Sequence, residues 1–219
     1  MWYKVKKIYQ WTNLVRPVWK PWANTLGYWT FDDQNVNQIT DVSWNWNTLV
    51  YGAWNKITYS LLSWTDYYWN FNRSQYWKDI TWISNYTWCM WCKISQTWQQ
   101  YITMNNWIDL IYWFNSWQIE VYDYYWWSSY RSTLKSNTQL NTWMCIWFSK
   151  NWSTVTTYYN WSKVWTPSFA NYQLTGVWIW WNQSQWLIWS LNNVILEDRV
   201  WSDSDWSNYY NLTKSNYWL

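Results

Sequence analysis

The amino-acid sequence predicts an all-β protein folded as an antiparallel β-sandwich. From residue 25 onward, short apolar runs are separated by clusters rich in Asn, Ser, Thr and Trp, a pattern typical of sandwiches made of many short strands. In residues 118–124, Ile119 and Val121 alternate with Glu120 and Tyr122. This period of two indicates a strand with one buried face, and we expect the face of Ile119 to lie toward the core.

The first residues differ from the rest of the chain. Residues 1–22 contain Pro17 and Pro21, and proline within sheets is confined to edge positions. We therefore expect residues 1–22 to form an extended leader or attachment segment, and residues 23–219 to form the sandwich domain. Its expected strands are 26–31, 49–51, 57–62, 79–84, 100–104 and 118–124.

Two hairpins and a helical turn are expected further along. Asn151-Trp152 and Asn160-Trp161 enclose an expected strand at 154–159, and Asn is common in the central positions of two-residue hairpin loops. Ser202 is followed three residues later by Asp205. This spacing is that of a capping box, which predicts a short C-terminal helical turn.

Tryptophan stands where glycine is expected. The chain has 33 Trp and 3 Gly in 219 residues, whereas average usage would give roughly 15 Gly. A hairpin loop needs positive φ angles, which a bulky residue rarely adopts. We therefore hypothesise that most Trp letters represent glycine encoded by UGA, and we expect exposed indoles at the turn positions. Those positions are Trp44, Trp46, Trp152 and Trp161.

The alternative is an authentic Trp-rich protein with aromatic sugar platforms, which need an exposed face on a strand or a rigid loop. Several tryptophans lie in strand-like apolar contexts and are expected to be authentic in either case. They are Trp29, Trp82, Trp178, Trp180, Trp189 and Trp201.

Residues 24–53 read Asn-Thr-Leu-Gly-Tyr-Trp-Thr-Phe-Asp-Asp and then, eight residues later, Asp-Val-Ser-Trp-Asn-Trp-Asn-Thr-Leu-Val-Tyr-Gly-Ala. This stretch resembles the opening of laminin-G-like modules of the concanavalin A-like lectin/glucanase superfamily, in which glycines stand at the positions of Trp44 and Trp46. Residues 144–164 and 186–210 resemble later parts of the same module. The resemblance implies a jelly-roll sandwich, a fold that hosts lectins, hydrolases, lyases and adhesion modules.

Catalysis finds little support in the sequence. Glycoside hydrolases of this superfold typically carry Glu-x-Asp-x-x-Glu on one strand, whereas here Glu120 and Asp123 have a different spacing and Glu197 is the only other glutamate. Residues three apart in a strand face opposite sides, so Glu120 and Asp123 cannot share one face. We expect no enzyme, and a glycoside hydrolase or polysaccharide lyase remains the less favoured alternative.

Four oxygen-bearing side chains make calcium the metal to consider. Calcium takes oxygen ligands from loops, and Asp32, Asp33, Asp41 and Asn45 fall in one loop region; the favoured reading is that Asp41 and Ser43 bind turn amides instead. We therefore expect no cofactor, with calcium as the alternative.

The pair Cys89 and Cys92, with Cys145, is too small for a structural zinc site. It leaves a local disulfide or buried thiols as alternatives.

Composition excludes several classes of function. The net charge is +3 and charged residues make up 12%, too few for a nucleic-acid footprint. The absence of histidine excludes imidazole chemistry. No apolar run is long enough to cross a membrane, and no signal peptide is visible at the N-terminus.

The sequence thus predicts a non-catalytic recognition or adhesion module that binds a glycan or a cell-surface ligand, on a phage virion or a bacterial cell exterior. The expected ligand contacts are the aromatic residues Tyr124, Tyr125 and Tyr130, taken as loop residues. The alternative is a structural virion component that assembles with copies of itself or a virion partner through residues 1–22.

Overall fold

The structure is a computed structural model. It describes residues 9–10, 13–14, 23–30, 38–43, 45–51, 58–61, 67–70, 76–94, 100–103, 108–113, 118–125, 128–165, 174–179 and 189–217.

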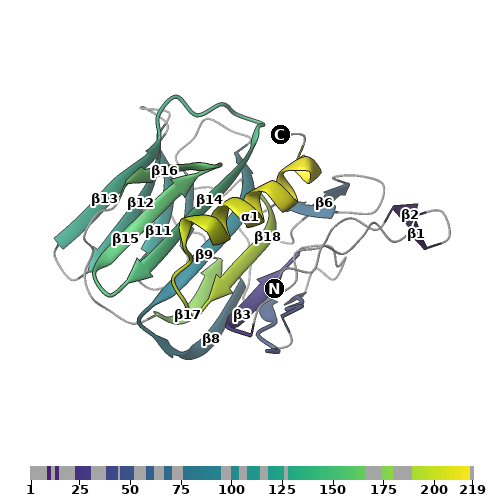
Figure 1. Ribbon diagram of the computed structural model, residues 1–219, viewed down its shortest axis with the longest axis horizontal. Coiled ribbons are helices and arrows are strands. Elements are labelled where there is room, and N and C mark those ends of the chain that lie inside the picture. Colours follow the sequence, from purple (N-terminus) through teal and green to yellow (C-terminus); the bar gives the residue numbers. More distant parts are fainter. Residues whose placement is uncertain are drawn as a thin grey trace.

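Antiparallel sheets make up most of this described part of the chain (Figure 1). The largest sheet has the strand order β16 (Ser162–Trp165), β15 (Thr154–Tyr159), β14 (Trp143–Asn151), β9 (Tyr86–Ile94), β18 (Trp189–Glu197), β7 (Tyr67–Asn70) and β6 (Thr58–Leu61), and β3 (Thr25–Trp29) also pairs with β18.

Two smaller sheets and a separate hairpin complete the strands. One sheet has the order β10 (Gln100–Thr103), β11 (Ile108–Trp113), β12 (Gln118–Tyr125) and β13 (Ser128–Lys135). The other has the order β17 (Leu174–Ile179), β8 (Tyr76–Ile83), β5 (Leu49–Tyr51) and β4 (Gln38–Ile39). Strands β1 (Tyr9–Gln10) and β2 (Asn13–Leu14) pair with each other and lie apart from the sandwich in Figure 1.

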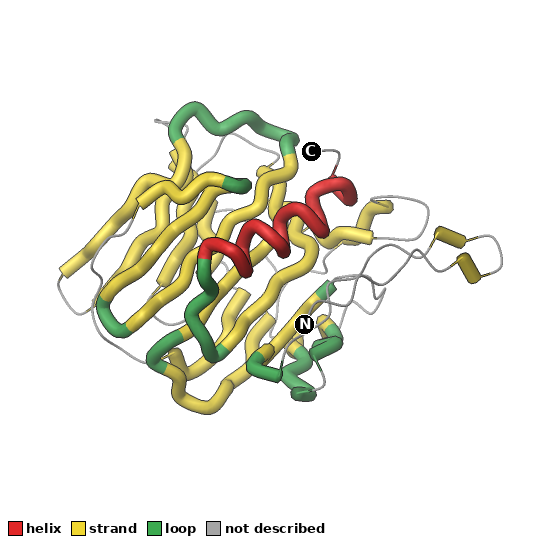
Figure 2. The backbone as a smooth tube through the Cα atoms, viewed as in Figure 1, coloured by secondary structure: helices red, strands yellow, loops and turns green. Residues whose placement is uncertain are grey.

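The large sheet is covered on both faces. The helix α1 (Asp203–Thr213) lies across one face, as Figures 1 and 2 show, and is followed by the 3-10 helix η2 (Lys214–Tyr217). On the other face, Lys135 of β13 lies over the ring of Tyr159 of β15, with its Nζ 5.5 Å from the ring centre. The predicted all-β antiparallel sandwich is confirmed, and its C-terminal helix is longer than the expected single turn.

Strands β9 and β14 carry the core. Cys89, Trp91, Cys145 and Trp147 are buried in the same cluster as Trp206 and other aromatic residues of α1. The alternate residues of both strands, Met90 and Ile146 among them, are buried as well. A strand buried on both faces reads as a continuous apolar run without alternation, which is why β9 is not predicted by the alternation of its residues.

Strand β12 departs from the expected pattern of one buried face. Ile119 is buried as predicted, but Glu120 is also buried, with 4% of its side chain exposed. Both faces of the sheet are therefore covered at this end of β12. The prediction that only the face of Ile119 is covered is wrong here.

The hairpin turns place tryptophan at exposed positions. Asn151 pairs with Thr154, so the loop between β14 and β15 is Trp152-Ser153 and not the expected Asn151-Trp152. Trp152 has a φ of 53°, which corresponds to the first loop position of a type II′ turn, where glycine is favoured.

Three of the four turn indoles are confirmed as exposed: Trp46, Trp152 and Trp161 are 84%, 58% and 73% exposed. Trp44 lies outside the described residues. Glycine coding at these positions remains a hypothesis.

Candidate functional site

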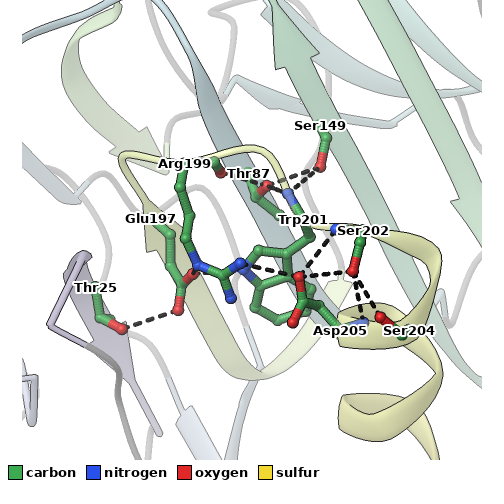
Figure 3. Close-up of polar contacts among 9 residues, drawn as sticks. All are labelled: Thr25, Thr87, Ser149, Glu197, Arg199, Trp201, Ser202, Ser204 and Asp205. Atoms are coloured by element: carbon green, nitrogen blue, oxygen red, sulfur yellow. Dashed lines mark hydrogen bonds and ion pairs between the residues drawn. The ribbon is translucent and has the colours of Figure 1, made fainter.

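Glu197, the last residue of β18, lies at the centre of the polar network drawn in Figure 3. Its carboxylate accepts hydrogen bonds from Thr25 Oγ1 at 2.9 Å and from the indole Nε1 of Trp201 at 2.5 Å. It also forms an ion pair with Arg199, whose Nε lies 2.8 Å from Oε2. The side chain of Glu197 is fully buried. The network therefore joins β3 to the segment that leads into the helix.

Arg199 connects this carboxylate to the start of α1. Its Nη1 lies 2.9 Å from Oδ2 of Asp205, and Asp205 forms the predicted capping box with Ser202. The Ser202 hydroxyl lies 3.2 Å from the backbone nitrogen of Asp205, and Asp205 Oδ2 accepts from the backbone nitrogen of Ser202 at 3.0 Å. The capping box predicted from the sequence is confirmed.

The two carboxyl groups titrate in opposite directions. Burial raises the pKa of Glu197 to about 7, although Trp201, Arg199 and Thr25 each favour its charged form. Burial also raises the pKa of Asp205, but bonds from Arg199 and Ser202 outweigh it and leave that pKa below its ordinary value. The dominant effect at Glu197 is the loss of water around a carboxylate without full compensation.

A second set of contacts fixes the chain between β18 and α1. The Thr87 hydroxyl donates to the carbonyl of Arg199 at 2.7 Å and accepts from the backbone nitrogen of Trp201 at 2.9 Å. Ser149 Oγ lies 2.7 Å from the same hydroxyl. Because Glu197 is fully buried and bonded to Thr25, Trp201 and Arg199, we assign it a structural role and not that of a cleft carboxylate.

Asp41 binds backbone groups of the loop that carries Asp41 and Asn45, two of the four calcium candidates. Its Oδ1 accepts from the backbone nitrogens of Tyr28 and Ser43 at 2.9 and 2.8 Å, and its Oδ2 accepts from the nitrogen of Asn47 at 2.9 Å. Asn45 donates its side-chain amide to the carbonyl of Thr25.

Both carboxylate oxygens of Asp41 therefore bind backbone N–H groups, as the favoured reading of the sequence predicts. Asp32 and Asp33 lie outside the described residues, and within the described ones no group of three His, Cys, Asp or Glu side chains could hold a metal ion. Calcium binding stays an untested alternative.

The three tyrosines expected to bind ligand are not in a loop. Tyr124 and Tyr125 belong to β12 and Tyr130 to β13. Tyr124 pairs with Ser129, while Tyr125 pairs with Ser128 and Asp123 with Tyr130. Directly paired residues share a face, and neighbours along a strand do not. The register therefore places Tyr125 and Tyr130 on one face and Tyr124 on the other. Their role in binding stays a prediction.

Of the two alternatives for the cysteines, the structure agrees with buried thiols and not with a local disulfide. Cys89 and Cys92 are three residues apart in β9 and so belong to opposite faces of the strand, which excludes the local disulfide. The neighbour of Cys89 is Cys145, with 3.8 Å between the two sulfur atoms. All three thiols are free and buried, and burial raises the pKa values of Cys92 and Cys145. They are thiols of the core.

No protein-family model matches this chain, and no curated protein sequence does. Among solved structures, it is similar to Domain 4 of AbnA, a GH43 extracellular arabinanase from Geobacillus stearothermophilus, in complex with arabinotriose. The TM-score is 0.66 at 14% identity, over 84% of this chain and 97% of that domain.

The chain is also similar to the binding domain of Paraclostridial Mosquitocidal Protein 1, with a TM-score of 0.65 at 12% identity over 86% of this chain. A similar match, with a TM-score of 0.65 at 9% identity, is the binding domain of botulinum neurotoxin DC in complex with rat synaptotagmin II. The chain spans about half the length of these two toxin domains, 52% and 51%. At these identities the matches establish the fold, an all-β sandwich shared with ligand-binding domains.

None of the described helices is long and apolar enough to cross a membrane.

Proposed function

We propose that this protein is a non-catalytic module that binds glycans on a cell surface or in the extracellular space. The observation that carries the proposal is the match to 97% of the arabinanase domain, which was solved with arabinotriose bound. The toxin domains add support, because both are binding domains and one was solved in complex with rat synaptotagmin II.

The two glutamates of the chain support a non-catalytic role. A retaining or inverting glycosidase needs two carboxyl groups that face the scissile bond. Glu197 is fully buried and bonded to Thr25, Trp201 and Arg199. Glu120 is buried on β12 and accepts from the hydroxyl of Thr133 at 3.3 Å. Both carboxyl groups are buried, so neither is placed to face a scissile bond.

A glycan array with the purified chain tests this function. We expect binding to at least one class of oligosaccharide, with an affinity that a soluble sugar of the same class competes away. Absence of binding across neutral and anionic glycans would contradict the proposal. Hydrolysis of a bound oligosaccharide, followed by product analysis, would instead favour the enzyme alternative.

The alternative is a structural virion or assembly component. It is supported by the hairpin of β1 and β2, which pairs with itself and stands apart from the sandwich in Figure 1. Size-exclusion chromatography of the full chain and of a chain without residues 1–22 discriminates the two functions. Loss of an oligomer on truncation supports assembly, and an unchanged monomer supports the glycan-binding module.

A further inference from the structure

Cys89 of β9 and Cys145 of β14 bring their sulfur atoms into contact beneath α1. The two Sγ atoms lie 3.8 Å apart, and both residues are fully buried. They belong to the same core cluster as Trp206 and Tyr209 of α1. The two thiols therefore face each other on the helix-covered face of the large sheet.

The third cysteine, Cys92, does not reach this pair. It follows Cys89 by three residues in β9, and the pairing of β9 with β14 has no register shift between the two. Side chains three apart in a regular strand point to opposite faces, and Cys92 is buried outside the cluster beneath α1. The chain has three cysteines, all of them described, so the fold places one pair of sulfur atoms side by side.

The register makes the two cysteines diagonal neighbours. Cys89 pairs with Trp147 and Cys145 pairs with Trp91, and these are successive pairs on one face of the ladder. Diagonal neighbours in a sheet are about 7–8 Å apart, whereas the Cα atoms of ordinary disulfides are about 4.4–6.8 Å apart. A bond between the two sulfur atoms therefore draws the strands together locally, and a disulfide under such strain is easily reduced.

From this contact and its register, we infer that Cys89 and Cys145 form a reversible disulfide between β9 and β14 when the chain meets a small disulfide oxidant such as glutathione disulfide. The sulfur atoms approach from 3.8 Å to about 2 Å, through rotation of both side chains and a small shift of the strands. The linkage makes the large sheet a redox-sensitive element. This inference does not depend on the glycan-binding function.

The exchange proceeds in two balanced steps. One thiol loses its proton, and its thiolate attacks glutathione disulfide, so that a mixed disulfide forms and one glutathione thiolate leaves. The thiolate of the other cysteine then attacks the protein sulfur of the mixed disulfide and releases the second glutathione. Two cysteine thiols are thereby oxidised to one disulfide, while one glutathione disulfide is reduced to two molecules of glutathione.

The helix α1 controls access to the pair. Trp206 and Tyr209 of α1 pack in the cluster that contains both thiols, so the oxidant does not reach them while α1 is in place. Burial also raises the pKa of Cys145, which disfavours the thiolate that the exchange requires. Both steps therefore take place when α1 opens locally, or during folding before α1 covers the strands.

Oxidation under two conditions tests the linkage. The reduced chain is refolded in a glutathione redox buffer, a second sample is oxidised in urea, and the linked cysteines are identified by peptide mapping after alkylation of the free thiols. After refolding, we expect the free thiols to fall from three to one, with Cys89 linked to Cys145. In urea, we expect Cys89 to link to Cys92, because the shorter loop closes at a lower entropic cost. Mild reduction of the refolded sample with dithiothreitol should restore all three thiols.

Two variants serve as a matched pair, since both remove a buried thiol. Cys92→Ala should keep the Cys89–Cys145 linkage, and Cys145→Ala should lose it. Peptide mapping of the unmodified chain decides the question even where a variant does not fold. The proposal is overturned by the absence of a linkage after refolding, by a Cys89–Cys92 linkage in the folded chain, or by the same Cys89–Cys145 linkage in urea. A linkage that resists mild reduction overturns its reversibility.

Discussion

At the scale of single residues, Trp46 and Trp152 have φ angles of 59° and 53°. These angles lie in the left-handed region, which costs an L-residue with a bulky side chain about 1–2 kcal/mol. Glycine adopts the region freely but has a larger entropy in the unfolded chain, worth about 0.5–1 kcal/mol. The two effects oppose each other, and relief of the strain is the larger.

We therefore expect Trp46→Gly and Trp152→Gly each to raise the free energy of unfolding, by about 0.5–1 kcal/mol. The matched control is Trp161→Gly. Trp161 is also exposed and lies in a turn, but it does not have a positive φ, so this change should be neutral or slightly destabilising. Urea denaturation of the three variants measures the difference, and equal effects at all three positions would count against the account.

The same positions decide the origin of the tryptophans. If Trp46, Trp152 and Trp161 stand for glycine, their codons are UGA. Sequencing the coding DNA therefore tests the hypothesis directly, and UGG codons at these positions, together with Trp44, would refute it.

The buried indoles fall into two groups. Trp29 donates its Nε1 to the carbonyl of Asn47, Trp91 to the hydroxyl of Thr213 and Trp201 to Glu197. In contrast, the Nε1 atoms of Trp88, Trp147 and Trp206 are buried without a partner among the residues that the structure describes.

We expect Trp201→Phe to lower the free energy of unfolding by about 1–2 kcal/mol more than Trp147→Phe. The first change removes a donor to a buried carboxylate, and the second removes an unpaired donor. Both residues are buried, so the loss of apolar area is similar. Thermal or urea unfolding of the two variants gives the comparison, and a larger loss for Trp147→Phe would argue against a stabilising bond to Glu197.

Part of this division between bonded and unbonded indoles could be predicted from the sequence. Trp29 and Trp201 were expected to be authentic, and their indoles are bonded in the core. The ring of Trp29 also lies against Gly27, where a Cβ atom would be 2.3 Å from the ring. The buried position of this indole therefore requires glycine at residue 27. Trp91 lies in a continuous apolar run, in which composition alone cannot separate a packed indole from a glycine.

At the scale of elements, the start of α1 depends on Arg199. This residue bonds both to buried Glu197 and to Asp205 of the capping box. Arg199→Ala leaves the carboxylate of Glu197 without its ion-pair partner. Ser202→Ala removes only the hydroxyl that caps the helix.

We expect Arg199→Ala to cost about 2–3 kcal/mol of unfolding free energy, below the range for fully buried pairs because Arg199 is 27% exposed. Ser202→Ala should cost about 1 kcal/mol. Chemical denaturation followed by tryptophan fluorescence measures both. Equal losses would mean that Arg199 acts only through the cap.

Elements whose ends are marked by neighbouring turn or capping residues could be predicted from the sequence. The strand 154–159 matches β15 at both ends, the strand 49–51 matches β5, and the capping box is where Ser202 and Asp205 place it. The network of Glu197 was not predictable, because Thr25 lies 172 residues before Glu197 and only the pairing of β3 with β18 brings them together. Tyr124, Tyr125 and Tyr130 were predicted as ligand contacts from residue type alone, because the register of β12 and β13 cannot be read from the sequence.

At the scale of the whole molecule, stability depends on pH through Glu197. Its pKa is raised from 4.5 to about 7 in the folded state. Between these values the unfolded chain ionises while the folded chain retains the proton. The contribution of Glu197 to stability is therefore complete below pH 4.5 and is lost as the pH rises through 7.

We expect this loss to reach about 3 kcal/mol at neutral pH, and Glu197→Gln to remove it. Asp198→Asn, at the neighbouring exposed residue, is the control and should keep the pH dependence. Urea unfolding at pH values from 4 to 8 measures how the free energy of unfolding changes with pH. A free energy of unfolding that rises over this interval in the unmodified chain, but not in Glu197→Gln, would reverse the sign assigned to this group.

Strand β3, the first of the large sheet, pairs with β18, so Thr25 bonds to a carboxylate that lies 172 residues later. During synthesis, the ribosome must add 172 residues after Thr25 before Glu197 of β18 exists and the strand can take its place between β9 and its other neighbours. Until then the aromatic surfaces of β9 and β14 lack their covering helix. A nascent chain of this kind is exposed to aggregation until β18 and α1 have been added, and its production in a host cell should respond to the supply of chaperones that bind apolar segments.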